Sequence, residues 1–339
     1  MVSLRLRLTH LMTQTNMIAA PVAYLHSQEF YFPSDIGSHL AHSHAEDNSG
    51  ATLTPTSPLT LSNLDELNVF ANSGVEVYLT SNEGIQALPS WFQGSRPSTD
   101  GTLPPSTTAI ITVSKANDTI DAFYFYFYAY NQGNWVLGLP ALEFGDHVGD
   151  WEHTMVRFVR GVPQSVYFSQ HSSGQAFTYS AVQKADTDMH SRNGLGVRPV
   201  VYIANGTHAN YATPGPHDHT IPNVNTLVGP LTDHTDAAGI IWDPLPQALC
   251  YDYDVDADVF TAYSSGGGSP PMPISAAGWL NFNGRWGDRQ LPDDTDGQLD
   301  VFGQRKYVSG PTGPRDKGLA RTKVCPDGHE CVVLPFLVP

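Results

Sequence analysis

The chain has 339 residues, of which 40% are hydrophobic, so it is long enough to bury a full core in one large domain or two small ones. Its 33 acidic and 17 basic residues give a net charge of −16, which repels nucleic acid phosphates and anionic lipid surfaces. No stretch approaches the roughly 18 apolar residues that a membrane-spanning helix needs. We therefore expect a soluble protein without a nucleic acid partner and without a transmembrane segment.

Residues 1–19 do not have the composition of a secretory signal peptide. Two arginines, Arg5 and Arg7, precede a stretch in which apolar residues are interrupted by Thr, Gln and Asn. The apolar centre of this stretch is too short and too polar for a signal peptide. We expect these residues to form a poorly ordered N-terminal extension.

Most of the remaining elements are expected to be strands. Glycine and proline are frequent, at 30 and 26 residues, and no long window repeats apolar residues with helical spacing. One short helix is expected at Leu59–Asn68. The strongest strand is Asp121–Tyr130, in which phenylalanines alternate with tyrosines, so both of its faces must be covered. Further strands are expected at Val75–Thr80, Ala109–Val113, Asp150–Val159, Ser165–Ser169, Ala176–Ala181, Val197–Ala204 and Arg305–Val308.

Short strands at this spacing, joined by turn-rich loops, are typical of a β-sandwich. We predict a mainly β protein with two packed sheets, long loops and a few short helices, in a single domain from residue 20 to residue 339. Residues 264–271 consist of Ser, Gly and Pro and are expected to form a flexible loop. Residues 272–339 become aromatic again and are expected to form a peripheral layer on the sandwich.

The three cysteines predict one disulfide. Cys325 and Cys331 flank a Pro-Asp-Gly sequence that favours a turn and would bring the two sulfur atoms together. Such a bond would argue for an oxidising compartment. Cys250 lies among apolar neighbours and is expected to be a buried core thiol.

A dense group of ionisable residues lies at Gly145–His153, which contains three carboxylates and two imidazoles. Side chains on a strand alternate between its faces, so Asp150 and Glu152 share one face and Trp151 lies on the other. Two adjacent carboxylates repel each other unless a cation or a base neutralises them. This stretch therefore has the composition of a metal site.

His147, three residues before Asp150, can turn an imidazole nitrogen toward the same carboxylates. One imidazole and two carboxylates suit a divalent ion such as Mg, Ca, Mn or Zn. We predict that His147, Asp150 and Glu152 bind such an ion. The alternative is that Asp150 caps a turn and Glu152 pairs with an arginine on the sheet.

Two further histidines follow predicted strands, at positions where loops often carry function. His208 lies in a polar stretch directly after Val200–Ala204 and could be a metal ligand, a general base or a hydrogen-bonded core residue. His171 could line the same pocket, or be the solvated histidine of a turn. Both are candidate catalytic residues.

Several motifs of this chain resemble the vacuolar protein sorting-associated protein 62 family of fungi and plants. The resemblance runs from about Ala20 to Val333. The family is named for an association with protein delivery to the vacuole, and the resemblance implies no particular chemistry. The motifs that carry it are Pro33–Gly37, Val77–Asn82, Asp121–Tyr126, Gly145–His153, Asn205–Tyr211 and Gly310–Pro314.

A shorter motif is similar to the Gly-His-Arg-His-Asp-Trp-Glu heptapeptide of the necrosis-inducing toxins of plant pathogens. His147, Asp150 and Glu152 keep its His-x-x-Asp-x-Glu spacing, whereas Val148-Gly149 replaces the middle Arg-His pair. In that family these residues help to hold a divalent ion at the end of a β-sandwich that binds sphingolipid sugar headgroups. The resemblance implies the same three ligands here. For the family's additional acidic ligand, Asn131 or Asp146 would have to serve, and we assign Asp146.

The function predicted from these features is a divalent-metal-binding β-sandwich that recognises a polar headgroup or glycan, in vacuolar trafficking or at a membrane surface. Its partner would be a small molecule, a glycan or a lipid headgroup. The alternative is a metal-dependent enzyme, in which the ion activates water or polarises an oxygen while His208 or His171 transfers the proton. A structural ion that ties loops together is a third hypothesis. We prefer the binding module because the chain has no Gly-x-Ser-x-Gly, phosphate-loop or His-Glu-x-x-His motif. The vacuolar or endomembrane pathway, secretion and the cytoplasm all stay open as locations.

Overall fold

The structure, a computed structural model, describes residues 19–136, 139–185, 197–219, 231–246, 248–263, 277–301, 303–328 and 330–337. The predicted extension up to residue 18 and the predicted loop 264–271 lie outside the described residues. The described part is mostly β, as predicted, with one short α-helix, α2 (Ile36–Ala41). Within it, no helix has the length and apolar character needed to span a membrane. Short 3-10 helices are found at Leu64–Val69, Ile85–Ala87, Ser90–Gln93, Pro140–Leu142, Gly278–Asn281 and Pro314–Asp316.

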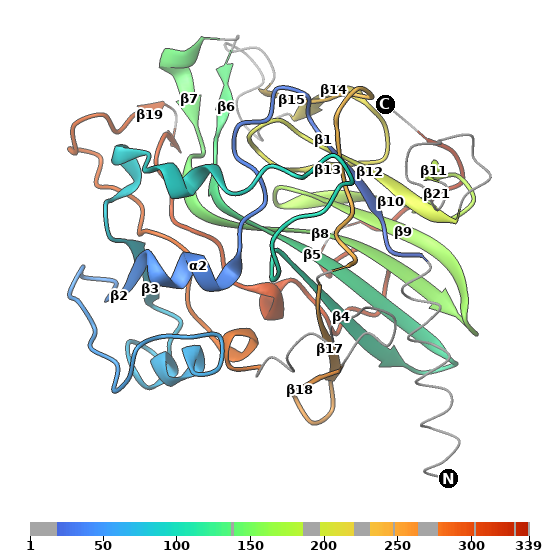
Figure 1. The fold of residues 1–339 in the computed structure, drawn as a ribbon, viewed down its shortest axis with the longest axis horizontal. Coiled ribbons are helices and arrows are strands. Elements are labelled where there is room, and N and C mark those ends of the chain that lie inside the picture. Colours follow the sequence, from blue (N-terminus) through green and yellow to red (C-terminus); the bar gives the residue numbers. More distant parts are fainter. Residues whose placement is uncertain are drawn as a thin grey trace.

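The larger sheet has at its centre two long neighbouring strands, β5 and β8 (Figure 1). Strand β5 is antiparallel to both of its neighbours, whereas the β17–β4 and β10–β21 pairs are parallel, so the sheet is mixed. In sheet order the strands are β18 (Val259–Ala262), β17 (Leu249–Asp254), β4 (Thr108–Lys115), β5 (Thr119–Asn131), β8 (His147–Val159), β9 (Val162–Gln170), β10 (Ser173–Thr178) and β21 (Val333–Leu334).

A smaller sheet is built around β1, which is parallel to β12 and antiparallel to β16. Its strands, in sheet order, are β11 (Lys184–Ala185), β12 (Arg198–Ile203), β1 (Val22–Leu25) and β16 (Ile240–Trp242), with β13 (Asn210–Tyr211) also paired to β12. Two-stranded ribbons are formed by β2 (Ser43–Asp47) with β3 (Val77–Ser81), β6 (Asn134–Trp135) with β7 (Glu143–Phe144), β14 (Gly215–His219) with β15 (Leu231–Thr235), and β19 (Asp300–Val301) with β20 (Gln304–Arg305).

The two sheets pack through the tyrosine face of β5. Tyr124, Tyr126 and Tyr128 share a buried apolar cluster with Leu25 of β1 and Trp242 of β16. The ring centroids of Tyr126 and Trp242 lie 5.2 Å apart. This cluster fills the space between the sheets, so the predicted β-sandwich is confirmed.

The phenylalanine face of β5 points away from the smaller sheet, into a second core. Phe127 packs on Trp151 of β8, with ring centroids 4.7 Å apart, and Trp151 stacks on Trp279. Trp279 and Trp286 are both fully buried. Residues of the predicted C-terminal layer thus take part in this core, together with α2 and the β2–β3 ribbon. Both faces of β5 are thus buried, as the alternation of Phe and Tyr predicted.

The candidate motif enters the sheet earlier than predicted. Strand β8 begins at His147 rather than Asp150, because β5 extends to Asn131 and the two strands stay paired to their ends. His147 therefore lies on the strand and not on a preceding loop.

Two other predicted elements are shorter than expected. The helix expected at Leu59–Asn68 is a 3-10 helix at Leu64–Val69, whose buried Leu64 and Leu67 have the three-residue spacing that this helix type favours. The strand expected at Arg305–Val308 ends at Arg305, because the following residues cross to the β7–β8 connection, where Tyr307 forms an isolated bridge with Asp146.

The predicted disulfide is present. Cys325 and Cys331 are bonded, with Cα atoms 5.3 Å apart. Cys250 is a buried free thiol, and burial raises its pKa to about 12, so it is not a reactive nucleophile.

Replacing Trp151 with alanine should lower the free energy of unfolding by about 3–5 kcal/mol, because the side chain is 1% exposed and its loss leaves a cavity in the core. The matched control is Trp135→Ala, at a position that is 47% exposed, where the change should be within about 0.5 kcal/mol. Urea denaturation measures both. Equal losses in the two variants would contradict the packing described for Trp151.

Candidate functional site

The candidate site begins at Gly149, where another segment of the chain meets β8. Gly149 has a φ of +66°, and a Cβ atom there would lie 1.7 Å from the carbonyl oxygen of Trp286. Glycine alone avoids both the backbone strain and this overlap. The backbone at Trp286 can therefore approach β8 directly beside Asp150.

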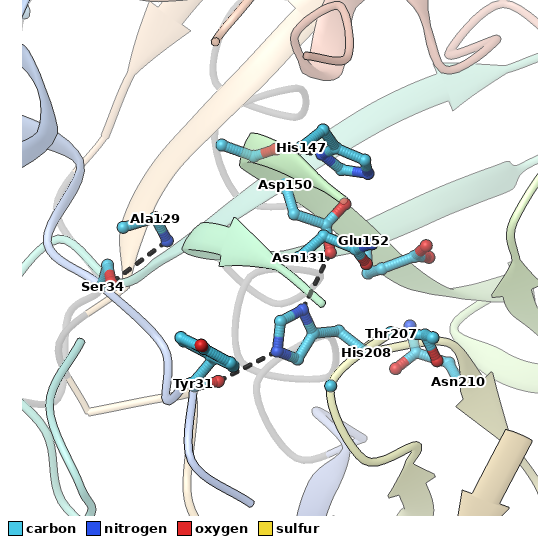
Figure 2. Close-up of polar contacts among 12 residues, drawn as sticks. Tyr31, Ser34, Ala129, Asn131, His147, Asp150, Glu152, Thr207, His208 and Asn210 are labelled. Atoms are coloured by element: carbon cyan, nitrogen blue, oxygen red, sulfur yellow. Dashed lines mark hydrogen bonds and ion pairs between the residues drawn. The ribbon is translucent and has the colours of Figure 1, made fainter. Parts of the chain in front are cut away.

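Asp150 is paired with His208. The imidazole Nδ1 of His208 donates to a carboxylate oxygen of Asp150 at 3.1 Å, and its Nε2 donates to the carbonyl oxygen of Tyr31 at 2.9 Å (Figure 2). The His208 ring is fully buried and lies flat on the Tyr128 ring, with centroids 3.7 Å apart. Because both partners are acceptors, both ring nitrogens carry a proton and His208 is an imidazolium ion.

The pKa values of this pair agree with an ion pair. Burial lowers the pKa of His208, but the Asp150 hydrogen bond and the charges of Glu29 and Asp150 outweigh it and raise the pKa above its ordinary value. Burial raises the pKa of Asp150, but the hydrogen bond from His208 and the charge of His208 hold it below its ordinary value. In this arrangement His208 has no lone pair to offer an ion. Its catalytic role stays a prediction.

Glu152 lies on the same face of β8 as Asp150, as predicted from strand alternation, because their cross-strand partners Tyr126 and Tyr128 both face the smaller sheet. Both carboxylates are buried. Its carboxylate accepts a hydrogen bond from the Ser169 hydroxyl of β9. Burial and the charge of Asp150 raise the pKa of Glu152 to about 8. Glu152 is therefore mostly protonated at neutral pH, which is how the protein avoids two adjacent buried charges.

His147 has the protonation state of a metal ligand. Its Nδ1 donates to the carbonyl oxygen of Gly149 at 2.7 Å, and burial lowers its pKa although the nearby Asp150 charge opposes this. The ring is therefore neutral at pH 7, with its lone pair on Nε2. A backbone carbonyl commonly fixes the tautomer of a metal-binding histidine in this way.

His171 belongs to a second acid–imidazole pair. Its Nε2 donates to Asp233 of β15 at 2.7 Å, and Asp233 also accepts from the hydroxyls of Tyr211 and Thr207, at 2.6 and 2.7 Å. Burial lowers the pKa of His171, but the Asp233 charge and hydrogen bond raise it overall. Once it is ionised, Glu152 acts in the same direction.

Asp146 does not join this cluster. Its carboxylate lies 3.0 Å from the Lys306 ammonium and accepts a hydrogen bond from the Gly133 amide at 2.7 Å. Asp146 holds the base of the β6–β7 ribbon to the segment after β20. Its role as a metal ligand stays a prediction, although its carboxylate is already paired with a cation.

The donor chemistry of the site suits a divalent ion, whereas its present geometry does not. Within the described ranges, no three His, Cys, Asp or Glu side chains are arranged to hold a metal ion. Asp150 is engaged by His208, and Glu152 by Ser169. An ion would have to draw its ligands together.

Two buried carboxylates of the site could not be found from the sequence. Glu29 accepts hydrogen bonds from the amides of Phe30, Tyr31 and Gly206, and so fixes the Tyr31 carbonyl that faces His208. Its partner Gly206 is 177 residues away, and no local pattern signals this contact. Asp233 lies in a short strand between Thr232, which is half-buried, and His234, which is exposed, and nothing in the local sequence marks it as a buried residue.

Comparison with known proteins gives the family. The family model described as vacuolar protein sorting-associated protein 62 matches residues 119–293, just over half of the chain. The chain belongs to this family. The matched segment contains β5, β8 and the candidate histidines His147, His171 and His208. The resemblance read from the sequence motifs is thereby confirmed.

Two proteins of Saccharomyces cerevisiae are similar over most of the chain. Vacuolar protein sorting-associated protein TDA6 is 36% identical over 324 residues, and vacuolar protein sorting-associated protein 62 is 33% identical over 320 residues. Each alignment covers 90% of this chain and 66% of the yeast protein. The chain thus spans just under two thirds of the length of these relatives.

One solved structure also aligns, the crystal structure of Necrosis and Ethylene inducing Protein 2 from the causal agent of cocoa's Witches Broom disease. The alignment covers 59% of this chain and 67% of that chain, at 11% identity and a TM-score of 0.28. A score this low supports no conclusion about the fold or the site. The similarity of the His-x-x-Asp-x-Glu motif stays an observation on sequence.

Stability should fall as pH rises from about 5 to 8 in the presence of a chelator. The pKa of Glu152 is raised from 4.5 to about 8 in the folded protein, so in this window the folded state holds a proton that the unfolded chain has released. This stabilisation is complete below pH 4.5 and is lost as the pH reaches about 8. The raised pKa of His208 adds a contribution of the same sign above about pH 6.5.

Glu152→Gln should therefore flatten the dependence of unfolding free energy on pH, by up to about 1.4 kcal/mol per pH unit for one proton. Glu76→Gln, at an exposed position, is the matched control and should keep the wild-type slope. Urea denaturation at pH 5, 6, 7 and 8 measures all three proteins. The same slope in Glu152→Gln as in wild type would refute the assignment.

Proposed function

We propose that this chain acts in vacuolar protein sorting as a binding module for a polar headgroup or glycan, with a divalent cation held by His147, Asp150 and Glu152. The role in sorting rests on the names of the family and of its yeast relatives. The cation rests on one observation, the pair of adjacent buried carboxylates at Asp150 and Glu152, of which His208 neutralises one. The second carboxylate, Glu152, has no ion pair among the described residues and keeps its proton at neutral pH.

The three proposed ligands supply donors that divalent ions accept. His147 offers a neutral Nε2, and Asp150 and Glu152 offer carboxylate oxygens on the same face of β8. A cation would replace the proton of Glu152 and remove the repulsion between the two carboxylates. Binding of the ion would then complete a site in which the unliganded side chains are held apart by their hydrogen bonds.

At least one of Mg²⁺, Ca²⁺, Mn²⁺ and Zn²⁺ should raise the melting temperature of chelator-treated protein, because an ion bound by the folded state alone adds about 2.7 kcal/mol at 100 times its Kd. Glu152→Gln should abolish this rise, since glutamine keeps the shape and the Ser169 contact but loses the charge. Differential scanning calorimetry measures the shift for each ion in turn.

Glu76→Gln again serves as the control and should respond to the ion as wild type does. If no ion changes the melting temperature of the wild-type protein, the site is a hydrogen-bond network without a cation. Ligand recognition is tested separately, by binding to immobilised glycans and phosphorylated headgroups with and without the active ion. Binding that needs the ion would support the module.

A second candidate function, a metal-dependent enzyme, is favoured by the His171–Asp233 pair. A buried carboxylate with three or more donors holds His171 in one tautomer, as in many sites of proton transfer. His171 is partly exposed, whereas His208 is fully buried. His171 is therefore the better placed of the two predicted catalytic residues to reach a substrate.

If the chain is an enzyme, His171→Ala should reduce turnover about 10²- to 10⁴-fold and leave the cation-dependent rise in melting temperature intact. Chromogenic phosphodiesters and glycosides, assayed with Mg²⁺ or Mn²⁺, provide the readout, and His234→Ala, on the exposed face of β15, is the control. No turnover by the wild type on either class would count against the enzyme and leave the binding module as the preferred function.

A further inference from the structure

The β6–β7 ribbon projects from the body of the molecule at the end of β5 and β8 (Figure 1). In the sequence it lies between the aromatic strand and the candidate motif. Residues 132–142 contain no charged side chain, although 15% of the chain is charged, and Glu143 of β7 is paired with Lys306. Apolar side chains that a projection exposes to water are costly unless something covers them.

The base of the ribbon is held firmly. Val136 and Phe144 are buried against Leu231 of β15. The Trp135 indole donates from Nε1 to Glu143 at 2.9 Å across the ribbon. Trp135 is nevertheless 47% exposed and Leu139 is 50% exposed. Their apolar surfaces are thus displayed by an anchored support.

A second exposed aromatic residue, Phe30, lies on a loop that is hydrogen-bonded to the turn carrying His208. Phe30 is 55% exposed and follows Glu29, whose carboxylate accepts from the Gly206 amide at 3.0 Å. Gly206 in turn accepts a hydrogen bond at its carbonyl from the Gln132 amide, at 2.9 Å, where the β6–β7 ribbon begins. In the described part of the chain, the exposed Phe and Trp side chains are Phe30, Trp135 and Phe336. Phe30 follows Glu29 directly and Trp135 lies three residues after Gln132, and Glu29 and Gln132 are both hydrogen-bonded to Gly206 in the turn that carries His208.

The ribbon also contacts the polar side of the site directly. The amide of Asn134 donates to Asp233 at 3.2 Å, and Asp233 is the partner of His171. The exposed apolar residues and the proposed headgroup site therefore lie at one end of the sandwich. A lipid whose headgroup enters the site would bring its bilayer to this end.

We propose that Phe30, Trp135 and Leu139 form a docking surface for a bilayer of zwitterionic lipids. The proposal rests on the proposed function, in that the headgroup bound by the site belongs to a membrane lipid. Trp and Phe partition to the headgroup level of a bilayer, where an apolar ring and a polar edge are both satisfied. The net charge of −16 selects against anionic lipids, which repel the protein at long range.

Flotation of the full chain with phosphatidylcholine vesicles, in the presence of the active ion, tests this proposal. The wild type should float with the vesicles, and the Trp135→Ser/Leu139→Ser variant should bind at least 10-fold more weakly. The matched control is Val75→Ser/Val259→Ser, which removes two half-exposed apolar side chains elsewhere and should bind as wild type does. Vesicles containing one third phosphatidylserine should bind less. Preference for those anionic vesicles, or equal binding by both variants, would overturn the proposal.

Fluorescence quenching by brominated phosphatidylcholine gives a second readout. Trp135 is exposed, Trp91 is half-buried, and Trp151, Trp242, Trp279 and Trp286 are fully buried. Quenching should therefore be strong in wild type and clearly weaker in Trp135→Phe, which keeps an aromatic ring and should still float. The melting-temperature assay separates the two proposals. If a cation raises the melting temperature but the wild type does not float with the vesicles, the docking surface is refuted and the cation site is not. If the protein floats in a way that needs Trp135 but no cation raises the melting temperature, the cation site is refuted and the docking surface is not.

Discussion

The pairing of β5 with β8 is the constraint on which the rest of the structure depends. Each strand is buried on both faces, so the side chains on each face must suit the layer that covers it. On β8 this places Trp151 in the second core while Asp150 and Glu152 enter the space between the sheets. A shift of one residue would exchange the two sets, burying carboxylates among aromatic rings. The contact of Phe127 with Trp151 therefore fixes the register of the strand and the position of the site together.

Buried carboxylates need hydrogen-bond donors or positive charges beside them. Segments that are distant in the sequence supply these partners. His208 reaches Asp150 from a residue with a φ of +57°, a conformation that is strained for a non-glycine side chain. The Tyr31 carbonyl holds the other nitrogen, and Glu29 holds Tyr31. Because burial weakens solvent screening, each of these contacts is stronger than it would be at the surface, and each becomes costly to break alone.

The elements that follow from local alternation could be predicted from the sequence. The Phe/Tyr pattern of Asp121–Tyr130 predicts a strand covered on both sides, and the parity of Asp150 and Glu152 predicts their common face. The ends of the strands were harder to predict, since the start of β8 at His147 depends on how far β5 extends. The carboxylate of Glu29 and the pairing of His171 with Asp233 could not be predicted, because they join residues separated by 177 and 62 positions through loop backbones.

The buried carboxylates at the two ends of the β5–β8 pair are neutralised in different ways. Asp121, at the far end, accepts two hydrogen bonds from Arg157, both at 2.7 Å, and lies 3.4 Å from Lys115, so one buried carboxylate meets two permanent cations. At the site end, His208 is the one cationic side chain that the described residues place against Asp150 and Glu152. A closed cluster of the first kind has nothing to gain from a further ion. The second kind is balanced only while Glu152 keeps a proton, and that proton is what a bound cation would displace.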